Sequence, residues 1–138
     1  MAFSGPMEDR LAIREHYDAY SDATSRGDKA GWLACFATDA RWKTHYFELQ
    51  GEDAISATYD GIMGDVTDTT FFIQLGSIEV DGDTAKVRNQ QFESLLYANG
   101  STYDLVGEYH DELIRKDGRW LFKEKIYLVK REKKPDQA

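Results

Sequence analysis

The stretch YSDATSRGDKAGWLACFATDARW, residues 20–42, decides the fold of this chain. It reads as the end of one helix, a Gly27-Asp28 turn, a short amphipathic helix over residues 29–37 and the start of a strand. Gly27 suits the left-handed residue that ends a helix, and Asp28 suits the cap that begins the next one. The order indicates a helical cover that leads directly into a sheet.

Periodicity extends outward from this stretch in both directions. Between Met7 and Arg26, one helical face carries Ile13, Tyr17, Tyr20 and Thr24, at intervals of three or four residues. Downstream, the segment ARWKTHYFEL, residues 40–49, alternates in polarity and predicts a half-buried strand. Its two faces carry Trp42, Thr44 and Tyr46 on one side and Arg41, Lys43 and His45 on the other.

The rest of the chain changes from helical to strand periodicity. A third helix is expected over residues 52–63, because glycines at its end stop the pattern. Four long strands follow, separated by the turns DGD, NGS and KDG, and they cover residues 71–80, 84–98, 102–115 and 119–131. Helices first and strands after predict an α+β fold, in which three N-terminal helices cover one face of a curved antiparallel sheet.

Composition limits the classes of function. The 138 residues are enough for one domain with a core and too few for two, so residues 1–138 are treated as one domain. The formal net charge of -8 argues against nucleic acid or an anionic membrane as a partner, because phosphate binding needs a basic face. No apolar run approaches the roughly 20 residues of a membrane span, and no signal-peptide core is present near the start. A cytoplasmic location is therefore expected.

Motifs for metals and cofactors are missing from the sequence. Cys35 is the single cysteine and lies in the apolar run WLACF, which is typical of a small buried side chain. The three histidines, His16, His45 and His110, have no HxH or HxxxH spacing. GxGxxG, GxxxxGK[ST] and GxSxG do not occur. We therefore expect no cofactor and no metal ion.

Several short motifs occur in a characteristic order: GD, FATDARW, a helix start GEDAI, VDGDTAKV and KDGRWLF. In this order, over about residues 8–130, the chain resembles the SnoaL-like branch of the nuclear transport factor 2-like (NTF2-like) superfamily. The resemblance implies a cone-shaped fold that encloses a hydrophobic pocket. Members of the superfamily often pair through the open face of the sheet, so the resemblance also implies a homodimer. If strand alternation holds, the outward residues His45, Glu108, His110 and Glu112 lie at or near its interface.

The superfamily includes ketosteroid isomerases, scytalone dehydratase, hexachlorocyclohexane dehydrochlorinase, polyketide cyclases and proteins with no known activity, so fold alone does not fix the chemistry. Tyr20 matches the tyrosine with which the isomerases hold a substrate oxygen. Thr44 stands where the isomerases carry their proton-abstracting aspartate. Ser25 stands where the dehydratase-type relatives carry an aspartate, and residues 69–72 lack their histidine. Neither inherited acid–base pair is complete.

Two neighbouring residues of strand 102–115 are candidates to move a proton. His110 lies in GEYHDEL between carboxylates, which can fix its tautomer and raise its basicity. Strand alternation offers the opposite assignment, with Tyr109 toward the cavity and His110 toward solvent or a subunit interface. If Tyr109 points inward, so does Asp111, which is then a candidate general acid or base. The alternative for Asp111 is a structural hydrogen bond to the backbone or to a tyrosine hydroxyl.

Two further assignments stay open from the pattern alone. His16 either reaches the cavity edge from the first helix or is a satisfied helix residue. In strand 84–98, either of two sets of side chains can face the cavity. These sets are Asn89, Gln91 and Glu93, or Arg88, Gln90 and Phe92.

Aromatic side chains with hydroxyl groups are the most consistent signal. The expected ligand-binding residues are Tyr17, Thr24, Trp42, Thr44, Tyr46, Phe72 (or its neighbour Phe71) and Tyr109. Such a pocket suits a small hydrophobic oxygenated molecule, although the same residues could simply fill a core. We expect a cofactor-free lyase or isomerase of dehydratase, isomerase or cyclase type, in which Tyr20 holds the substrate oxygen and Asp111 or His110 moves the proton. The alternative is a non-catalytic small-molecule-binding or accessory protein of the same fold.

Overall fold

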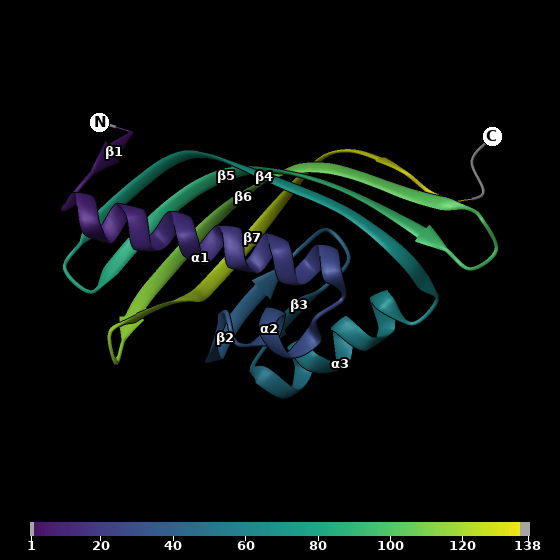
Figure 1. Ribbon diagram of the computed structural model, residues 1–138, viewed down its shortest axis with the longest axis horizontal. Coiled ribbons are helices and arrows are strands. Elements are labelled where there is room, and N and C mark those ends of the chain that lie inside the picture. Colours follow the sequence, from purple (N-terminus) through teal and green to yellow (C-terminus); the bar gives the residue numbers. More distant parts are fainter. Residues whose placement is uncertain (1, 136–138) are drawn as a thin grey trace.

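A single curved sheet dominates the computed structural model, which describes residues 2–135 (Figure 1). Its strands follow the order β1-β4-β5-β6-β7-β2-β3. They are β1 (Phe3–Ser4), β2 (Phe36–Lys43), β3 (Glu48–Gln50), β4 (Val66–Asp81), β5 (Thr84–Tyr97), β6 (Thr102–Lys116) and β7 (Arg119–Lys133). The four long strands pair antiparallel, whereas β1 pairs with β4 and β2 pairs with β7 in parallel. The sheet is therefore mixed, which the sequence pattern did not predict.

Three helices lie on the concave side of the sheet (Figure 1). They are α1 (Met7–Arg26), α2 (Lys29–Leu33) and α3 (Glu52–Met63). Gly27 ends α1 in the left-handed region, with a φ of 65°. Asp28 then caps α2, because its side chain accepts a hydrogen bond from the Gly31 backbone nitrogen at 3.0 Å. The α+β class is confirmed, and so is the order of helix, Gly27-Asp28 turn and second helix.

The segment after α2 differs from the expectation. The short helix ends at Leu33 instead of residue 37, and β2 already begins at Phe36. The Phe122 backbone nitrogen of β7 donates to the Cys35 carbonyl at 2.8 Å, and the Phe36 side chain is buried in the core. A helix this short gains little from its own hydrogen bonds, so pairing with β7 determines the conformation. The expected strand over 40–49 also breaks after Lys43 into a turn.

Aromatic rings from the helices and the sheet form the core between these two layers. The Tyr20 ring of α1 lies 5.0 Å from Phe122 and 5.8 Å from Phe71, measured between ring centres. Trp32 of α2 lies 4.7 Å from Phe36. Burying a large apolar side chain contributes roughly 1.5–3 kcal/mol, so these contacts hold α1 and α2 against the sheet.

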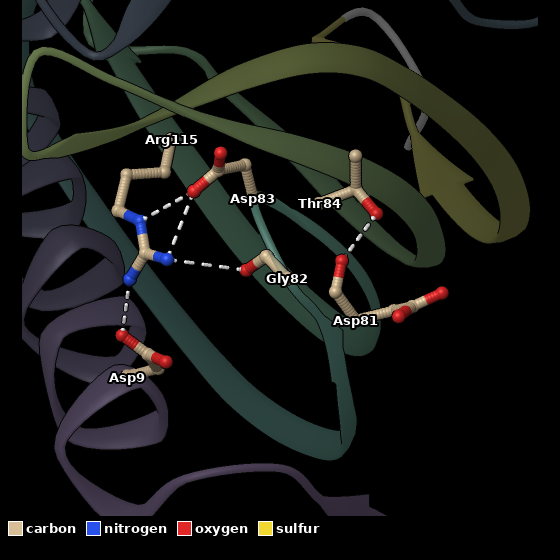
Figure 2. A network of polar contacts seen from close by, with 6 residues as sticks. All are labelled: Asp9, Asp81, Gly82, Asp83, Thr84 and Arg115. Carbon is tan, nitrogen blue, oxygen red and sulfur yellow. Dashed lines mark hydrogen bonds and ion pairs between the residues drawn. The ribbon is translucent and has the colours of Figure 1, made fainter.

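A polar network fastens the beginning of α1 to the β4–β5 hairpin (Figure 2). Arg115 of β6 donates to Asp9 of α1 at 2.6 Å, to Asp83 at 2.9 Å and to the Gly82 carbonyl at 3.4 Å. Its guanidinium carbon also lies 5.1 Å from the centre of the Trp120 ring. Arg115 therefore fixes the end of α1 that lies opposite Gly27. The helix is anchored at both ends, and this anchoring orients the tyrosines on its inner face.

Candidate functional site

A cavity of about 860 Å³ lies between the helices and the concave face of the sheet. Its deep walls are at most 7% exposed and include Tyr20, Trp32, Phe71, Gln91, Leu95 and Tyr109. Exposed lining residues, among them Tyr46 and Lys134, mark its mouth. A largely aromatic wall of this kind favours a hydrophobic ligand.

Polar side chains follow one another along the inner face of β5. Asn89, Gln91 and Glu93 stand between the buried residues Val87 and Leu95, and Gln91 and Glu93 line the cavity. Within residues 2–135, the Glu93 carboxyl takes part in no hydrogen bond or ion pair. Burial raises the pKa of Glu93 to about 7. A carboxyl group that is half-ionised near neutral pH can both accept and release a proton.

Two buried tyrosines can donate hydrogen bonds into the cavity. The Tyr109 hydroxyl accepts a hydrogen bond from Trp42 Nε1 at 3.0 Å, which leaves its own proton available. The Tyr20 hydroxyl proton has no hydrogen-bond acceptor within the described part of the chain. Burial raises the pKa of both phenols, and the nearby Glu93 charge adds to the rise. Both groups therefore stay protonated and suit a substrate oxygen.

A buried ion pair lies behind the cavity wall. Lys125 Nζ contacts Asp111 Oδ2 at 2.8 Å, and the two side chains are 1% and 0% exposed. The same oxygen accepts hydrogen bonds from the Tyr17 hydroxyl at 2.5 Å and from Asn89 Nδ2 at 3.0 Å. Burial lowers the pKa of Lys125, and its attraction to Asp111 opposes this. None of Tyr17, Asp111 and Lys125 belongs to the cavity lining.

The ion pair contacts the cavity tyrosines from behind. Lys125 Nζ lies 4.3 Å from the centre of the Tyr109 ring and 5.2 Å from that of Tyr20. A cation over an aromatic face is attracted to the ring, so Lys125 helps to hold both phenols in place.

The expected catalytic residues occupy three different environments. Tyr20 lines the cavity, whereas Asp111 makes the structural hydrogen bond to a tyrosine hydroxyl that was its alternative. His110 lies on the outer face of the sheet, where 52% of its side chain is exposed and Nε2 lies 2.8 Å from Glu108. Because neighbouring strand residues point to opposite faces, His110 cannot share the cavity with Tyr109. Neither Asp111 nor His110 lines this cavity.

Most of the expected ligand-binding residues line the cavity, namely Thr24, Trp42, Thr44, Tyr46 and Tyr109. Tyr17 does not, because its hydroxyl binds Asp111. Phe72 is 66% exposed on the outer face, so its assignment was wrong, and its neighbour Phe71 lines the cavity. His16 packs 4.4 Å from the Phe122 ring, and burial lowers its pKa to about 4.

Two residues of the site did not stand out from the sequence. Glu93 shares its parity with the apolar residues Val87 and Leu95, and this signal identifies the inner face of β5. Lys125 gave no such signal. An irregular register between Glu112 and Leu113 shifts the alternation along β7, so Phe122 and Lys125 both point inward at an interval of three residues.

A second hydrogen-bonded cluster lies at the cavity mouth. Glu132 Oε2 accepts hydrogen bonds from the Tyr103 hydroxyl at 2.5 Å and the Tyr46 hydroxyl at 2.6 Å, and His45 Nε2 lies 3.3 Å away. These contacts, with that of Tyr103 the strongest, lower the pKa of Glu132 to about 2. His45 and Tyr46 lie in the turn after β2, so both line the mouth and His45 does not face outward as expected.

Two kinds of feature are not found within residues 2–135. No group of three or more His, Cys, Asp or Glu side chains is arranged to hold a metal ion. In the same part of the chain, no helix is long and apolar enough to cross a membrane.

Known families and structures share this architecture. Residues 6–125 match the family model of the SnoaL-like domain, while no curated protein matches the chain by sequence. A candidate scytalone dehydratase from Novosphingobium aromaticivorans has a TM-score of 0.85 at 22% identity, over 96% of this chain and 90% of its own. A hexachlorocyclohexane dehydrochlorinase of type 2 has a TM-score of 0.80 at 15% identity, over 92% and 88%. Rv3472 from Mycobacterium tuberculosis, of unknown function, has a TM-score of 0.81 at 26% identity, over 91% and 79%.

Proposed function

This chain belongs to the SnoaL-like domain family, and from that premise we propose that it is a cofactor-free lyase or isomerase that moves a proton on a small hydrophobic oxygenated molecule. The observation that carries the proposal is Glu93, a carboxyl group with a pKa of about 7 in an aromatic cavity. Two structural relatives are named as a dehydratase and a dehydrochlorinase, which agrees with this class of reaction.

Glu93 takes the proton-transfer role that the sequence pattern gave to Asp111 or His110. In the proposed reaction, a substrate carbonyl oxygen accepts hydrogen bonds from Tyr20 and Tyr109. The Glu93 carboxylate then removes a proton from the carbon beside the carbonyl, and the electron pair moves onto the oxygen to form an enolate. A positioned general base of this kind contributes about 10²–10⁴-fold to a rate.

The protonated Glu93 completes the cycle by giving its proton back. When the substrate is a β,γ-unsaturated ketone, the enolate is a dienolate, and return of the proton to its γ-carbon yields the conjugated isomer. Given to a hydroxyl on the next carbon, it releases water and leaves an unsaturated ketone. The phenols of Tyr20 and Tyr109 stabilise the charge on the oxygen in both reactions. The buried Lys125 cation, behind both rings, favours the same charge.

Deuterium exchange at the carbon beside a carbonyl tests the proposal directly. A panel of 1-tetralone, 2-tetralone and their hydroxylated derivatives is incubated in D₂O, and exchange is followed by proton NMR. Wild-type protein should accelerate exchange, and Glu93→Gln should reduce the acceleration by about 100-fold or more. Fluorescence of Trp32 and Trp42, which line the cavity, should show that Glu93→Gln still binds the ketone.

Glu112→Gln is the matched control, because Glu112 is an exposed carboxylate on the outer face of β6. It should exchange deuterium at the wild-type rate. If the Glu93→Gln variant exchanges deuterium at the wild-type rate, the proposed role of Glu93 is wrong. Ketones that bind without any accelerated exchange would overturn catalysis and identify a non-catalytic binding protein.

A further inference from the structure

The cavity offers different hydrogen-bonding groups to a ligand at its mouth and at its deep end. Tyr46 and Tyr103 line the mouth, and both give their phenolic protons to Glu132 Oε2, at 2.6 Å and 2.5 Å. A carboxylate can only accept hydrogen bonds, so these two bonds can run in one direction only. The phenolic oxygens can then only accept hydrogen bonds, and no phenolic proton remains for a ligand at the mouth.

At the deep end of the cavity, the phenolic protons are available to a ligand. Trp42 Nε1 can only donate, so its 3.0 Å hydrogen bond occupies a lone pair of the Tyr109 oxygen and leaves the proton available. Tyr20 also keeps its proton, and both side chains are almost completely buried. A ligand oxygen at this end therefore meets two phenolic donors.

We propose that the cavity selects hydroxy ketones, with the carbonyl oxygen against Tyr20 and Tyr109 and a distant hydroxyl group against Tyr46 and Tyr103. The inference rests on the proposed function only in taking the carbonyl as the reacting group. Glu132 is a positioning residue in this arrangement, because it fixes the direction in which the two mouth phenols donate. A hydroxyl that donates to a phenolic oxygen gains a hydrogen bond there, whereas a methyl ether at the same place cannot.

Two other side chains at the mouth act on the same region. His45 shares the Glu132 oxygen at 3.3 Å, and its ring centre lies 4.1 Å from that of Tyr46. Lys134 Nζ lies 5.8 Å from the centre of the Tyr46 ring and is itself a donor. Replacing Lys134 by Gln therefore separates the effect of this cation from the effect of the two phenols.

Binding of matched ligands tests the proposal by titration calorimetry. The first set is 6-hydroxy-1-tetralone, 6-methoxy-1-tetralone and 1-tetralone. The second is 4′-hydroxyflavanone, 4′-methoxyflavanone and flavanone, which places the hydroxyl farther from the carbonyl. In at least one set, wild-type protein should bind the hydroxyl compound about tenfold more tightly than the methyl ether, the effect of one well-formed hydrogen bond. The absence of this preference in both sets would overturn the proposal.

Glu132→Gln is the decisive variant, because its amide has nearly the same shape and can donate as well as accept. Tyr46 and Tyr103 are then free to turn their protons toward the ligand, and the tenfold ratio should fall to about one. Tyr103→Phe should also reduce the ratio, whereas Lys134→Gln should preserve it. A merely structural Glu132 would change the affinity for all ligands alike and leave the ratio intact, which would contradict the proposal.

The outcome is independent of the test of catalysis. The ratio of dissociation constants requires no turnover, and it can be measured in Glu93→Gln. If the hydroxyl compound binds more tightly than the methyl ether but deuterium exchange is not accelerated, the proposed ligand class holds and the proposed catalysis does not. If exchange is accelerated but the hydroxyl compound is not preferred, the proposed catalysis holds and the proposed ligand class does not.

Discussion

The Glu93 carboxyl should make stability depend on pH. Its pKa is about 7 in the folded protein, against a usual value of 4.5, so the folded state binds more protons than the unfolded chain between these values. The stability associated with this group is fully present below pH 4.5 and is lost as the pH rises through about 7. We therefore expect Glu93→Gln to be more stable than wild type at pH 8, by a free energy of unfolding on the order of 1–3 kcal/mol.

Urea denaturation of both proteins at pH 4.5, 6 and 8 measures this difference. It should approach its smallest value at pH 4.5 and grow toward pH 8. His16 acts in the opposite direction, because its pKa is lowered to about 4 and stability falls as the pH drops from 6.5 toward that value. Both proteins contain His16, so its contribution cancels. A difference that does not vary with pH would contradict the assignment of Glu93.

The Lys125–Asp111 pair should be strongly coupled in a double-mutant cycle. Asp111→Asn keeps the shape of the side chain but leaves the buried Lys125 charge without its partner. Lys125→Met likewise leaves the buried Asp111 charge without its partner. Each single change should lower the free energy of unfolding by about 3–5 kcal/mol. The double variant should lose clearly less than the sum. Additive losses in urea denaturation would show that the two charges do not depend on each other.

At the scale of the element, Gly107 lets β6 and β7 pack closely. A Cβ atom added at Gly107 would lie 2.3 Å from the Tyr127 hydroxyl oxygen, so this ring passes directly over the backbone of β6. Gly107→Ala should therefore cost about 1–3 kcal/mol of stability in thermal or urea unfolding. In a Tyr127→Ala background, where the obstacle is gone, the same change should cost almost nothing.

Gly76 of β4 provides the control for this substitution. A Cβ atom there would meet its nearest neighbour, the Arg88 carbonyl oxygen, at 3.4 Å, so Gly76→Ala should be tolerated. Equal losses for Gly76→Ala and Gly107→Ala would show that the cost comes from strand backbone in general and not from Tyr127.

Long periodic segments were predictable from the sequence, and short or irregular ones were not. The helical pattern before Gly27 gave α1, and alternation between marked turns gave β5, β6 and β7. The β2 start at Phe36 was missed because it depends on pairing with β7, which no local pattern reveals. The two-residue strand β1 was missed for the same reason.

The candidate site followed the same rule. For cavity residues on regular elements, such as Tyr20 and Tyr109, periodicity predicted the inward face, and the family resemblance predicted that this face encloses a pocket. Lys125 was hidden by a register shift, and His45 was assigned to the outer face because the strand was expected to continue past Lys43. Glu93 was left undecided although its apolar neighbours Val87 and Leu95 mark the inner face. Site residues were therefore predicted less well where the backbone departs from regular helix or strand.

At the scale of the whole molecule, no helix within residues 2–135 covers the outer face of the sheet (Figure 1). Phe72 and Phe92 are directly opposed across β4 and β5, with ring centres 6.4 Å apart, and they are 66% and 38% exposed. Leu128 of β7 adds a third exposed apolar side chain, at 52%. Basic and acidic residues adjoin on the same face, as in the pair Lys86 and Glu112. A second copy related by a two-fold axis can match this combination of apolar surface and both charges.

We therefore expect a homodimer through this face, with Glu108, His110 and Glu112 near the interface. Light scattering at micromolar concentration should give about twice the 15.8 kDa mass of the chain. Phe72→Glu should produce a monomer, because a charge cannot be buried in an apolar contact without a partner. Leu11→Glu changes another exposed apolar side chain, on α1, and should stay dimeric. A monomeric wild type, or a dimer unaffected by Phe72→Glu, would contradict this prediction. The outer face of the sheet would then be exposed to solvent.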